Sequence, residues 1–220
     1  MAGQEHVLVI DRKVLEEIGM FHGLQFDVDN YLGRIFAPGV LRFIPRSQAE
    51  PNPAYKQLIP YVIMAHDGKY LTYVRGKRAG ETRLLGNRSI GIGGHINPVD
   101  NDAPLFDMDF QNAYFAAVER EVAEEVSVKT AHTDRIVALL NDESNDVGSV
   151  HLGIVHCWTL DSADVTKREQ MITQMAFMTP AELHQVRDTM ETWSQLCLDS
   201  LDKMTNRAKS PTKSSTIPHP

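Results

Sequence analysis

Two segments decide the fold: Ser89-Ile-Gly-Ile-Gly-Gly-His-Ile96 and, further along the chain, Ala113-Tyr-Phe-Ala-Ala-Val-Glu-Arg-Glu-Val-Ala-Glu-Glu-Val-Ser-Val128. The first is an apolar strand that runs into a pair of glycines. The second predicts a helix, because Ala, Val, Glu and Arg dominate it and neither Gly nor Pro interrupts it. At about 100° per residue, one stripe of this helix is apolar and should face a core. The stripe consists of Phe115, Val118, Val122 and Val126.

Three carboxylates share a neighbouring face of the predicted helix. Glu121, Glu124 and Glu125 follow the spacing i, i+3, i+4, and like charges at that spacing repel by about 0.2–0.5 kcal/mol per pair on an isolated helix. Arg120 offsets only part of this repulsion. A solvated acidic face is one interpretation, and a bound Mg²⁺ ion, which prefers carboxylate oxygens, is the other. The pair Gly93-Gly94 favours the ion, because its backbone can approach closely and offer a carbonyl oxygen.

The helix carries a family resemblance. Arg120-Glu-Val-Ala-Glu-Glu125 resembles the core of the Nudix hydrolase signature, and Gly93-Gly94 stands where that family has the glycines that open its box. The resemblance implies a loop-helix-loop unit that binds Mg²⁺ or Mn²⁺ and cleaves a pyrophosphate linked to a further moiety. It also implies that Glu121, Glu124 and Glu125 are metal ligands, that Gly93 lends a backbone carbonyl, and that Arg120 orients the glutamates.

The chain departs from the family pattern at three places. Asn112 stands where the family usually has a glutamate that pairs with the arginine, so positioning is affected more than chemistry. Ser127 replaces the glycine that usually follows the helix, which implies a different helix exit. The interval between Gly94 and Arg120 is longer than usual, and we interpret residues 97–109 as an inserted loop. Its four aspartates lack the ordered spacing of a calcium loop, so a solvated loop is expected.

Composition indicates an ordinary globular protein. The 220 residues suffice for one substantial core with appendages, and 42% are hydrophobic and 23% charged. A net charge of −7 argues against general affinity for a nucleic acid polymer or a membrane surface. The start of the chain does not resemble a secretory signal. Cys157 and Cys197 both lie in apolar runs and are expected to be buried thiols of a reducing compartment, so we expect a cytoplasmic protein.

The order of elements predicts an α/β (α+β) fold, a Nudix-like α/β/α sandwich with a mixed sheet. Leu58–Ala65 and Tyr70–Arg75 flank an Asp-Gly pair and predict a hairpin. Both faces of Val150–Leu160 are largely apolar, which predicts a central strand covered by helices on both sides. Met171–Met178 is the closing strand. Helices are expected to begin at Thr179, which is followed by Pro, and to span Met190–Met204.

We expect three parts in the chain. Residues 1–57 form an N-terminal extension packed on the main domain, with a strand at Val7–Ile10 and a helix at Arg12–Met20. Such extensions occur in the family and help to build the substrate pocket or a homodimer contact. Residues 58–204 form the Nudix-like domain. Residues 205–220 are rich in Lys, Arg, Ser, Thr and Pro and are expected to be a disordered tail.

Several polar residues are candidates for binding or catalysis. Arg75 and Arg78 lie near a strand end and are expected to contact substrate phosphates, although a solvated loop is the alternative. His95 follows the glycines and is either structural or a donor to a phosphate. Glu169 is either a surface acid or, by resemblance, the extra glutamate that related enzymes use as a base. His151 and His156 are expected to satisfy hydrogen bonds in the core.

These observations lead to one hypothesis and two alternatives. The hypothesis is metal-dependent hydrolysis of a phosphoanhydride in a nucleoside diphosphate-linked compound, with Glu121, Arg120 and either Glu124 or Glu169 as the catalytic groups. The first alternative is a catalytically silent nucleotide-sensing or interaction module of the same fold. The second is a prenyl diphosphate isomerase, which needs a catalytic cysteine that neither Cys157 nor Cys197 resembles.

Overall fold

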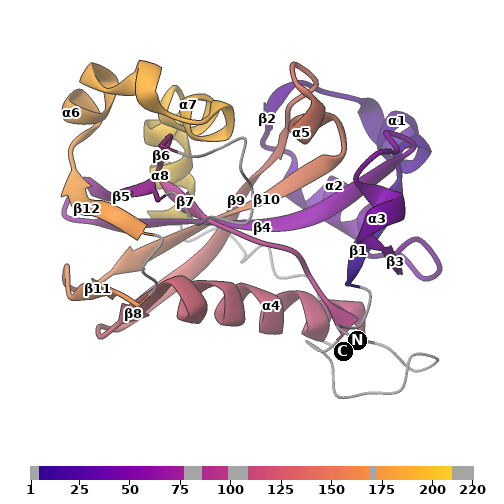
Figure 1. The fold of residues 1–220 in the computed structure, drawn as a ribbon, viewed down its shortest axis with the longest axis horizontal. Coiled ribbons are helices and arrows are strands. Elements are labelled where there is room, and N and C mark those ends of the chain that lie inside the picture. Colours follow the sequence, from indigo (N-terminus) through magenta and orange to yellow (C-terminus); the bar gives the residue numbers. More distant parts are fainter. Residues whose placement is uncertain (1–4, 77–85, 99–108, 169–171, 210–220) are drawn as a thin grey trace.

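A computed structural model of the chain describes residues 5–76, 86–98, 109–168 and 172–209 (Figure 1). The elements of the first half are β1 His6–Asp11, α1 Arg12–Gly19, β2 Gly23–Gln25, α2 Val28–Ile35, β3 Arg42–Pro45, α3 Arg46–Ala49, β4 Tyr55–His66, β5 Lys69–Arg75, β6 Arg88–Ser89 and β7 Gly91–Ile92. Those of the second half are α4 Phe110–Glu125, β8 Val126–Val128, β9 His132–Asn141, α5 Asp146–Ser149, β10 His151–Leu160, β11 Val165–Lys167, β12 Ile172–Met178, α6 Pro180–Gln185, the 3₁₀ helix η4 Arg187–Thr189, α7 Thr192–Leu198 and α8 Leu201–Lys209.

Strand β4 is a central strand of the main sheet. The strand order is β12-β5-β4-β10-β9-β2. Strands β4 and β10 are parallel, whereas β10 and β9 are antiparallel, so the sheet is mixed as predicted. Along its length β4 also pairs with β1 near its start and with β7 further on. The strand therefore connects the N-terminal elements, the glycine segment and the hairpin within one sheet.

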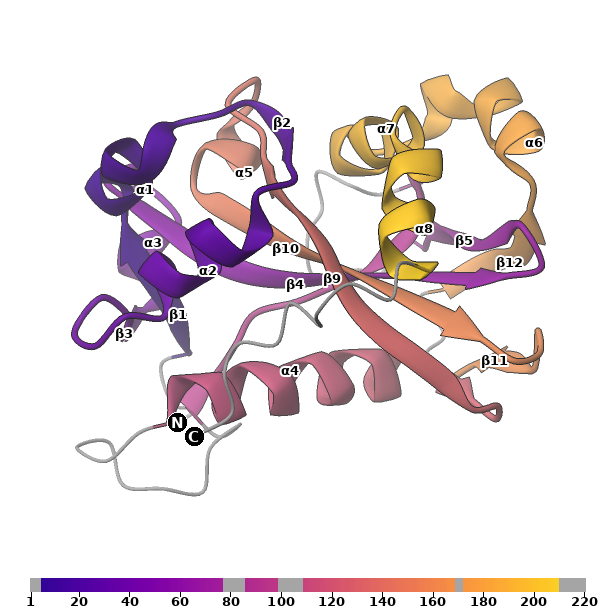
Figure 2. The ribbon, with the colours of Figure 1, turned by 180° about the vertical axis from the view of Figure 1, so that it is seen from behind.

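Each face of the sheet carries its own apolar core, because successive side chains of a strand point to opposite faces. On one face, Leu58, Val62 and Met64 of β4 belong to the cluster that includes α4. On the other face, Tyr61 and Ile63 pack in the cluster that includes α7 and α8. Figures 1 and 2 show α4 along one side of the sheet and the C-terminal helices on the other. The structure thus confirms the predicted α/β/α sandwich with β10 as a buried inner strand.

Local sequence signals account for several of these elements. The β4–β5 hairpin turns at Asp67 and Gly68, with φ of 46° and 71°, the left-handed conformation that Asp-Gly pairs supply in two-residue hairpins. Thr179 forms a capping box with Glu182 at the start of α6. The apolar stripe of α4 is buried as predicted at three of its four positions, and Tyr114 and Ala117 join it.

Other elements differ from the sequence-based expectation. The strand expected over residues 89–96 is reduced to the two short pairings of β6 and β7, because the Gly93-Gly94 backbone leaves the ladder to approach α4. The single helix expected over 190–204 is two helices, α7 and α8, interrupted at Asp199 and Ser200. Helix α8 continues to Lys209, so residues 205–209, expected in the tail, are helical.

The N-terminal extension is more regular than its sequence indicated. The strand and the helix expected within residues 7–20 are present as β1 and α1. Residues 21–50, which show no clean periodicity, add two strands and two helices. Among the described residues, no helix is both long and apolar enough to cross a membrane.

Candidate active site

A cleft of about 830 Å³ lies where the glycine segment, α4 and the N-terminal elements meet. Its polar lining comes from several distant parts of the chain: Glu5, Arg46 and Glu50, Arg75 and Asn87, Gly93–His95 with Asn97, Arg120, Glu121 and Glu124, the loop 145–148 with His151, and Glu191 and Thr192. Apolar lining comes from Ile59, Tyr61, Met190 and Trp193. The cleft therefore combines an acidic edge, histidines, arginines and an aromatic wall.

The acidic helix and the glycine pair are in direct contact. A β-carbon on Gly94 would lie 2.0 Å from Oε2 of Glu121, and one on Gly93 would lie 2.3 Å from the carbonyl oxygen of Pro60. A side chain at Gly93 would meet backbone that cannot move aside, whereas one at Gly94 would displace the Glu121 carboxylate, so the observed geometry requires glycine at both positions. The Glu121 carboxylate therefore lies directly against the Gly94 backbone.

Arg120 connects the two segments. Its Nη1 donates to Oε1 of Glu121 at 2.7 Å and to Oε1 of Glu124 at 3.3 Å, and its Nη2 donates to the carbonyl oxygen of His95 at 2.9 Å. Asn112, at the position of the usual pairing glutamate, instead donates to Asp109, the N-cap of α4. The His95 carbonyl thus provides a hydrogen-bond acceptor that holds the guanidinium.

The three glutamates occupy different surroundings. Glu121 and Glu124 line the cleft, whereas Glu125 lies behind them with one carboxylate oxygen buried. Burial raises the pKa of Tyr73. The positive charge of Arg75 opposes this increase, and the negative charge of Glu125 adds to it. The charge of Glu125 therefore reaches Tyr73 of β5. Helix α4 ends at Glu125, and Ser127 belongs to β8 instead of a glycine turn.

Arg75 is engaged inside the protein. Its Nε donates to Oε2 of Glu191 at 3.1 Å, and the Glu191 side chain is only 5% exposed. Ser89 Oγ and Tyr61 Oη also donate to Glu191, at 2.5 and 3.3 Å. Although burial opposes it, the surrounding negative groups raise the pKa of Arg75, so the guanidinium is charged. Arg75 lines the cleft, but this buried ion pair is its principal interaction among the described residues.

The wall opposite α4 is held by a buried lysine. Lys56 Nζ donates to Glu143 at 2.6 Å and to the carbonyl oxygen of Gly148 at 3.0 Å, and its side chain is fully buried. Asp142 accepts hydrogen bonds from Ser144 and Asn145 in the same loop. These bonds fix residues 145–148, which line the cleft.

The histidines divide between the core and the cleft. His156 is fully buried between Tyr114 and Asp134, as expected of a core histidine. His151 satisfies a core bond at Nδ1, with the carbonyl oxygen of Val147 at 2.6 Å, but its Nε2 lies 3.3 Å from Nε2 of His95. Glu50 completes a group with these two residues.

Two residues that the sequence indicated for the site lie in parts of the chain that the structure does not describe. Arg78 and Glu169 lie outside the described residues, as does most of the inserted loop.

Both cysteines are buried, free and absent from the cleft lining. Burial raises the pKa of the Cys157 thiol to about 11, which is unlike a catalytic thiol.

The residues that the structure adds to the cleft and that the sequence did not indicate as part of a site include Glu50, His151, Glu191 and Trp193. Each lies far along the chain from the glycine-helix unit. The pairing of β4 with β10 brings His151 opposite Gln57, close to the segment that carries Glu50. His151 and Glu50 come together only through this long-range register, and no local sequence pattern encodes it.

Comparison with known proteins identifies the family. No family model matches the chain. Protein YmaB of Bacillus subtilis (strain 168) is 30% identical over 189 residues, which cover 83% of this chain and 89% of that protein. The crystal structure of Tm1382, a putative Nudix hydrolase, is 26% identical with a TM-score of 0.71 and covers 90% of this chain and 98% of its own. The Nudix domain of Shewanella oneidensis NrtR, solved with ADP ribose, shares the fold at 14% identity and a TM-score of 0.50, over 69% and 88% of the two chains.

The fold, the glycine pair against an Arg-Glu-Val-Ala-Glu-Glu helix, and these similarities agree with one another. The chain belongs to the Nudix hydrolase family of pyrophosphohydrolases.

Proposed function

We propose that the protein hydrolyses the pyrophosphate bond of a nucleoside diphosphate-linked compound with the help of Mg²⁺ or Mn²⁺. The observation that carries the proposal is the contact between the Glu121 carboxylate and the Gly94 backbone inside a cleft large enough for such a ligand. Ligand pockets typically have volumes of about 300–1,000 Å³.

The residues fit a hard divalent cation. Glu121 and Glu124 line the cleft together with Gly93, whose backbone carbonyl is the oxygen that it can offer, and Glu125 lies on the same helix. Oxygen donors of this kind suit Mg²⁺ and Mn²⁺. When bound, the ion would neutralise phosphate charge and lower the pKa of a water molecule.

The protein's own groups have distinct roles in this proposal. Arg120 fixes the rotamers of Glu121 and Glu124 by its hydrogen bonds. Glu124, whose side chain is 56% exposed, is free to accept a proton from the attacking water, and Glu169 remains the alternative base. Arg46 and Arg75 place positive charge on the cleft wall, where the phosphates of the substrate would lie.

The aromatic wall supports a nucleoside-like moiety. Tyr61 and Trp193 form an edge-to-face pair with ring centroids 5.6 Å apart, and Trp193 lines the cleft. A planar base can stack on such a surface. ADP ribose, the ligand of the NrtR domain, belongs to this chemical class.

The test is product release from a panel of dinucleotides, nucleotide sugars, ADP ribose and nucleoside triphosphates, with Mg²⁺ or Mn²⁺. We expect Glu124→Gln and Glu125→Gln to lower kcat by at least about 100-fold on the best substrate, as loss of an acid-base group does. Glu119→Gln is the matched control, because this acid is exposed on the same helix and outside the cleft lining. Full activity in both variants would refute the assignment. Calorimetric binding without product would favour the sensing module.

A further inference from the structure

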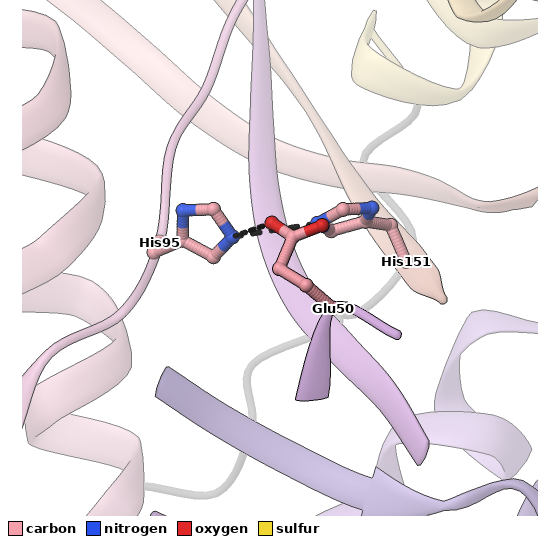
Figure 3. A group of neighbouring side chains, drawn as sticks. All are labelled: Glu50, His95 and His151. Carbon is pink, nitrogen blue, oxygen red and sulfur yellow. Dashed lines mark hydrogen bonds and ion pairs between the residues drawn. The ribbon is translucent and has the colours of Figure 1, made fainter. Parts of the chain in front are cut away.

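A second group of potential metal ligands lies in the same cleft, apart from the acids of α4. Glu50, His95 and His151 each offer one ligand atom, and these three atoms lie within 4.8 Å of one another. Figure 3 shows them converging from the end of α3, the segment after the glycine pair, and the start of β10. Among the described residues, this is the one group of three or more His, Cys, Asp or Glu side chains with such proximity.

The orientation of His151 suits a metal ligand. Its Nδ1 lies 2.6 Å from the carbonyl oxygen of Val147, and a carbonyl can only accept, so Nδ1 carries the proton. Nε2 therefore presents its lone pair toward His95 and Glu50. An imidazole whose other nitrogen donates to a backbone carbonyl is the usual arrangement of a metal-binding histidine, since that bond fixes the tautomer and the ring.

The spacing of the donor atoms also fits an ion. The two Nε2 atoms are 3.3 Å apart, which matches the ligand-ligand edge of about 3.3 Å in a tetrahedron with bonds of about 2.0 Å. Nε2 of His95 lies 4.0 Å from Oε1 of Glu50. A small rotation of the Glu50 side chain, which is 24% exposed, closes that edge.

The surrounding charges decide which ion this group would bind. Arg46 donates to Glu50 at 3.1 Å, so much of the negative charge of Glu50 is already compensated. A hard ion that relies on carboxylate charge gains little here. An ion that binds imidazole nitrogen strongly, such as Zn²⁺ or Co²⁺, is less dependent on that charge.

We propose that Glu50, His95 and His151 form a second cation site, specific for a transition metal of the Zn²⁺ type. Three protein ligands leave at least one coordination position open, and all three residues line the cleft, so that position faces the space where a ligand enters. The site does not depend on the proposed hydrolysis, because it uses different side chains from the acids of α4.

Co²⁺ binding to the full-length, untagged protein tests this proposal, because Co²⁺ bound by imidazole in a four- or five-coordinate site gives visible absorption bands. We expect these bands to saturate at one equivalent of Co²⁺ and to disappear when Zn²⁺ is added. Glu50→Gln and His151→Gln should each weaken Co²⁺ binding by at least about 10-fold, the lower end of what loss of outer-shell support alone costs. Circular dichroism without metal checks that each variant is folded. If His151→Gln does not fold, the result for Glu50→Gln decides the test.

Two controls separate this site from the others. His184→Gln removes an exposed histidine of α6 and should leave the bands unchanged. The double variant Glu121→Gln/Glu124→Gln removes the two acids of α4 that line the cleft and should also retain the bands. The proposal is wrong if the wild type shows no bands, if Glu50→Gln keeps them at full strength, or if they vanish in the α4 double variant.

Discussion

The carboxylate of Glu121 lies against the backbone of Gly94, so closely that a β-carbon on that glycine would meet Oε2 at 2.0 Å. If residue 94 had a side chain, this contact would be relieved by movement of the Glu121 carboxylate, because that group lies at the flexible end of its side chain. The position of the Glu121 carboxylate is therefore set by the lack of a side chain at residue 94.

This relationship gives the first prediction. Gly94→Ala should displace Glu121 and lower kcat on any pyrophosphate substrate by at least about 100-fold, because misplacement by about 1 Å can have that effect. The fold should persist, as judged by thermal unfolding. Gly33→Ala is the control: no atom lies within 4 Å of its would-be β-carbon, and alanine in a helix stabilises by about 1 kcal/mol relative to glycine. Unchanged kcat in Gly94→Ala would contradict the prediction.

The buried pair of Arg75 and Glu191 should be essential for stability. Glu191→Gln leaves the charged guanidinium without its carboxylate, and breaking a buried pair typically costs about 3–5 kcal/mol in the free energy of unfolding. Urea unfolding measures this change. Asp199→Asn, which removes the partner of Arg187 in an exposed pair, should cost less than about 1 kcal/mol. Equal effects of the two substitutions would show that burial of the first pair is unimportant.

Acid should destabilise the loop beside the cleft. Burial opposes ionisation of Glu143, but hydrogen bonds from Lys56 and Arg12 outweigh it and lower the pKa of Glu143 below its ordinary value of 4.5. Burial likewise opposes ionisation of Asp142, and bonds from Ser144 prevail and lower the pKa of Asp142. A depressed folded-state pKa adds stability that is present above the unfolded value and is lost as pH falls through the folded one.

We therefore expect the free energy of unfolding to fall as pH drops below about 4.5, measured by urea unfolding from pH 7 to pH 3. Glu143→Gln should flatten this dependence, because the variant has one fewer carboxylate to protonate. Glu119→Gln, on the exposed face of α4, should keep the wild-type slope. An identical slope in Glu143→Gln would exclude a contribution from this residue.

Trp193 should report ligand binding. It lines the cleft, whereas Trp158, the other tryptophan, is buried in the core beneath His132. In the Glu124→Gln background, which should bind without turnover, ADP ribose with Mg²⁺ should change the intrinsic fluorescence. Trp193→Phe should abolish this change and Trp158→Phe should retain it. A response that survives in Trp193→Phe would mean that the ligand does not reach this wall.

The sequence predicted those parts of the molecule whose signal is local. The glutamate spacing and apolar stripe of α4, the Asp-Gly turn at Asp67 and the capping threonine at Thr179 all depend on residues within a few positions of one another. The contact between Gly94 and Glu121 is not local in this sense, because the two residues lie far apart in the chain, and only the family resemblance indicated that the two segments belong together.

The features that the sequence did not indicate depend on distant pairing. Glu50 and His151 are adjacent only because β10 runs parallel to β4. Arg75 likewise pairs with Glu191, which lies 116 residues further along the chain. The break between α7 and α8 leaves Leu198, Leu201 and Met204 buried on both sides of it, so the apolar spacing did not reveal it. No periodicity in the sequence records such registers.

The position of β1 bears on how the chain can be shortened. This strand pairs with Tyr55–Gln57 of β4, and Leu8 donates to the carbonyl oxygen of Ile96, one residue beyond His95. A truncated protein beginning at residue 58 would lose the start of the central strand and leave adjacent sheet edges uncapped, and bare edges of this kind recruit further chains. Variants that lack residues 1–57 should therefore self-associate, and enzymology is best done on the chain that retains them.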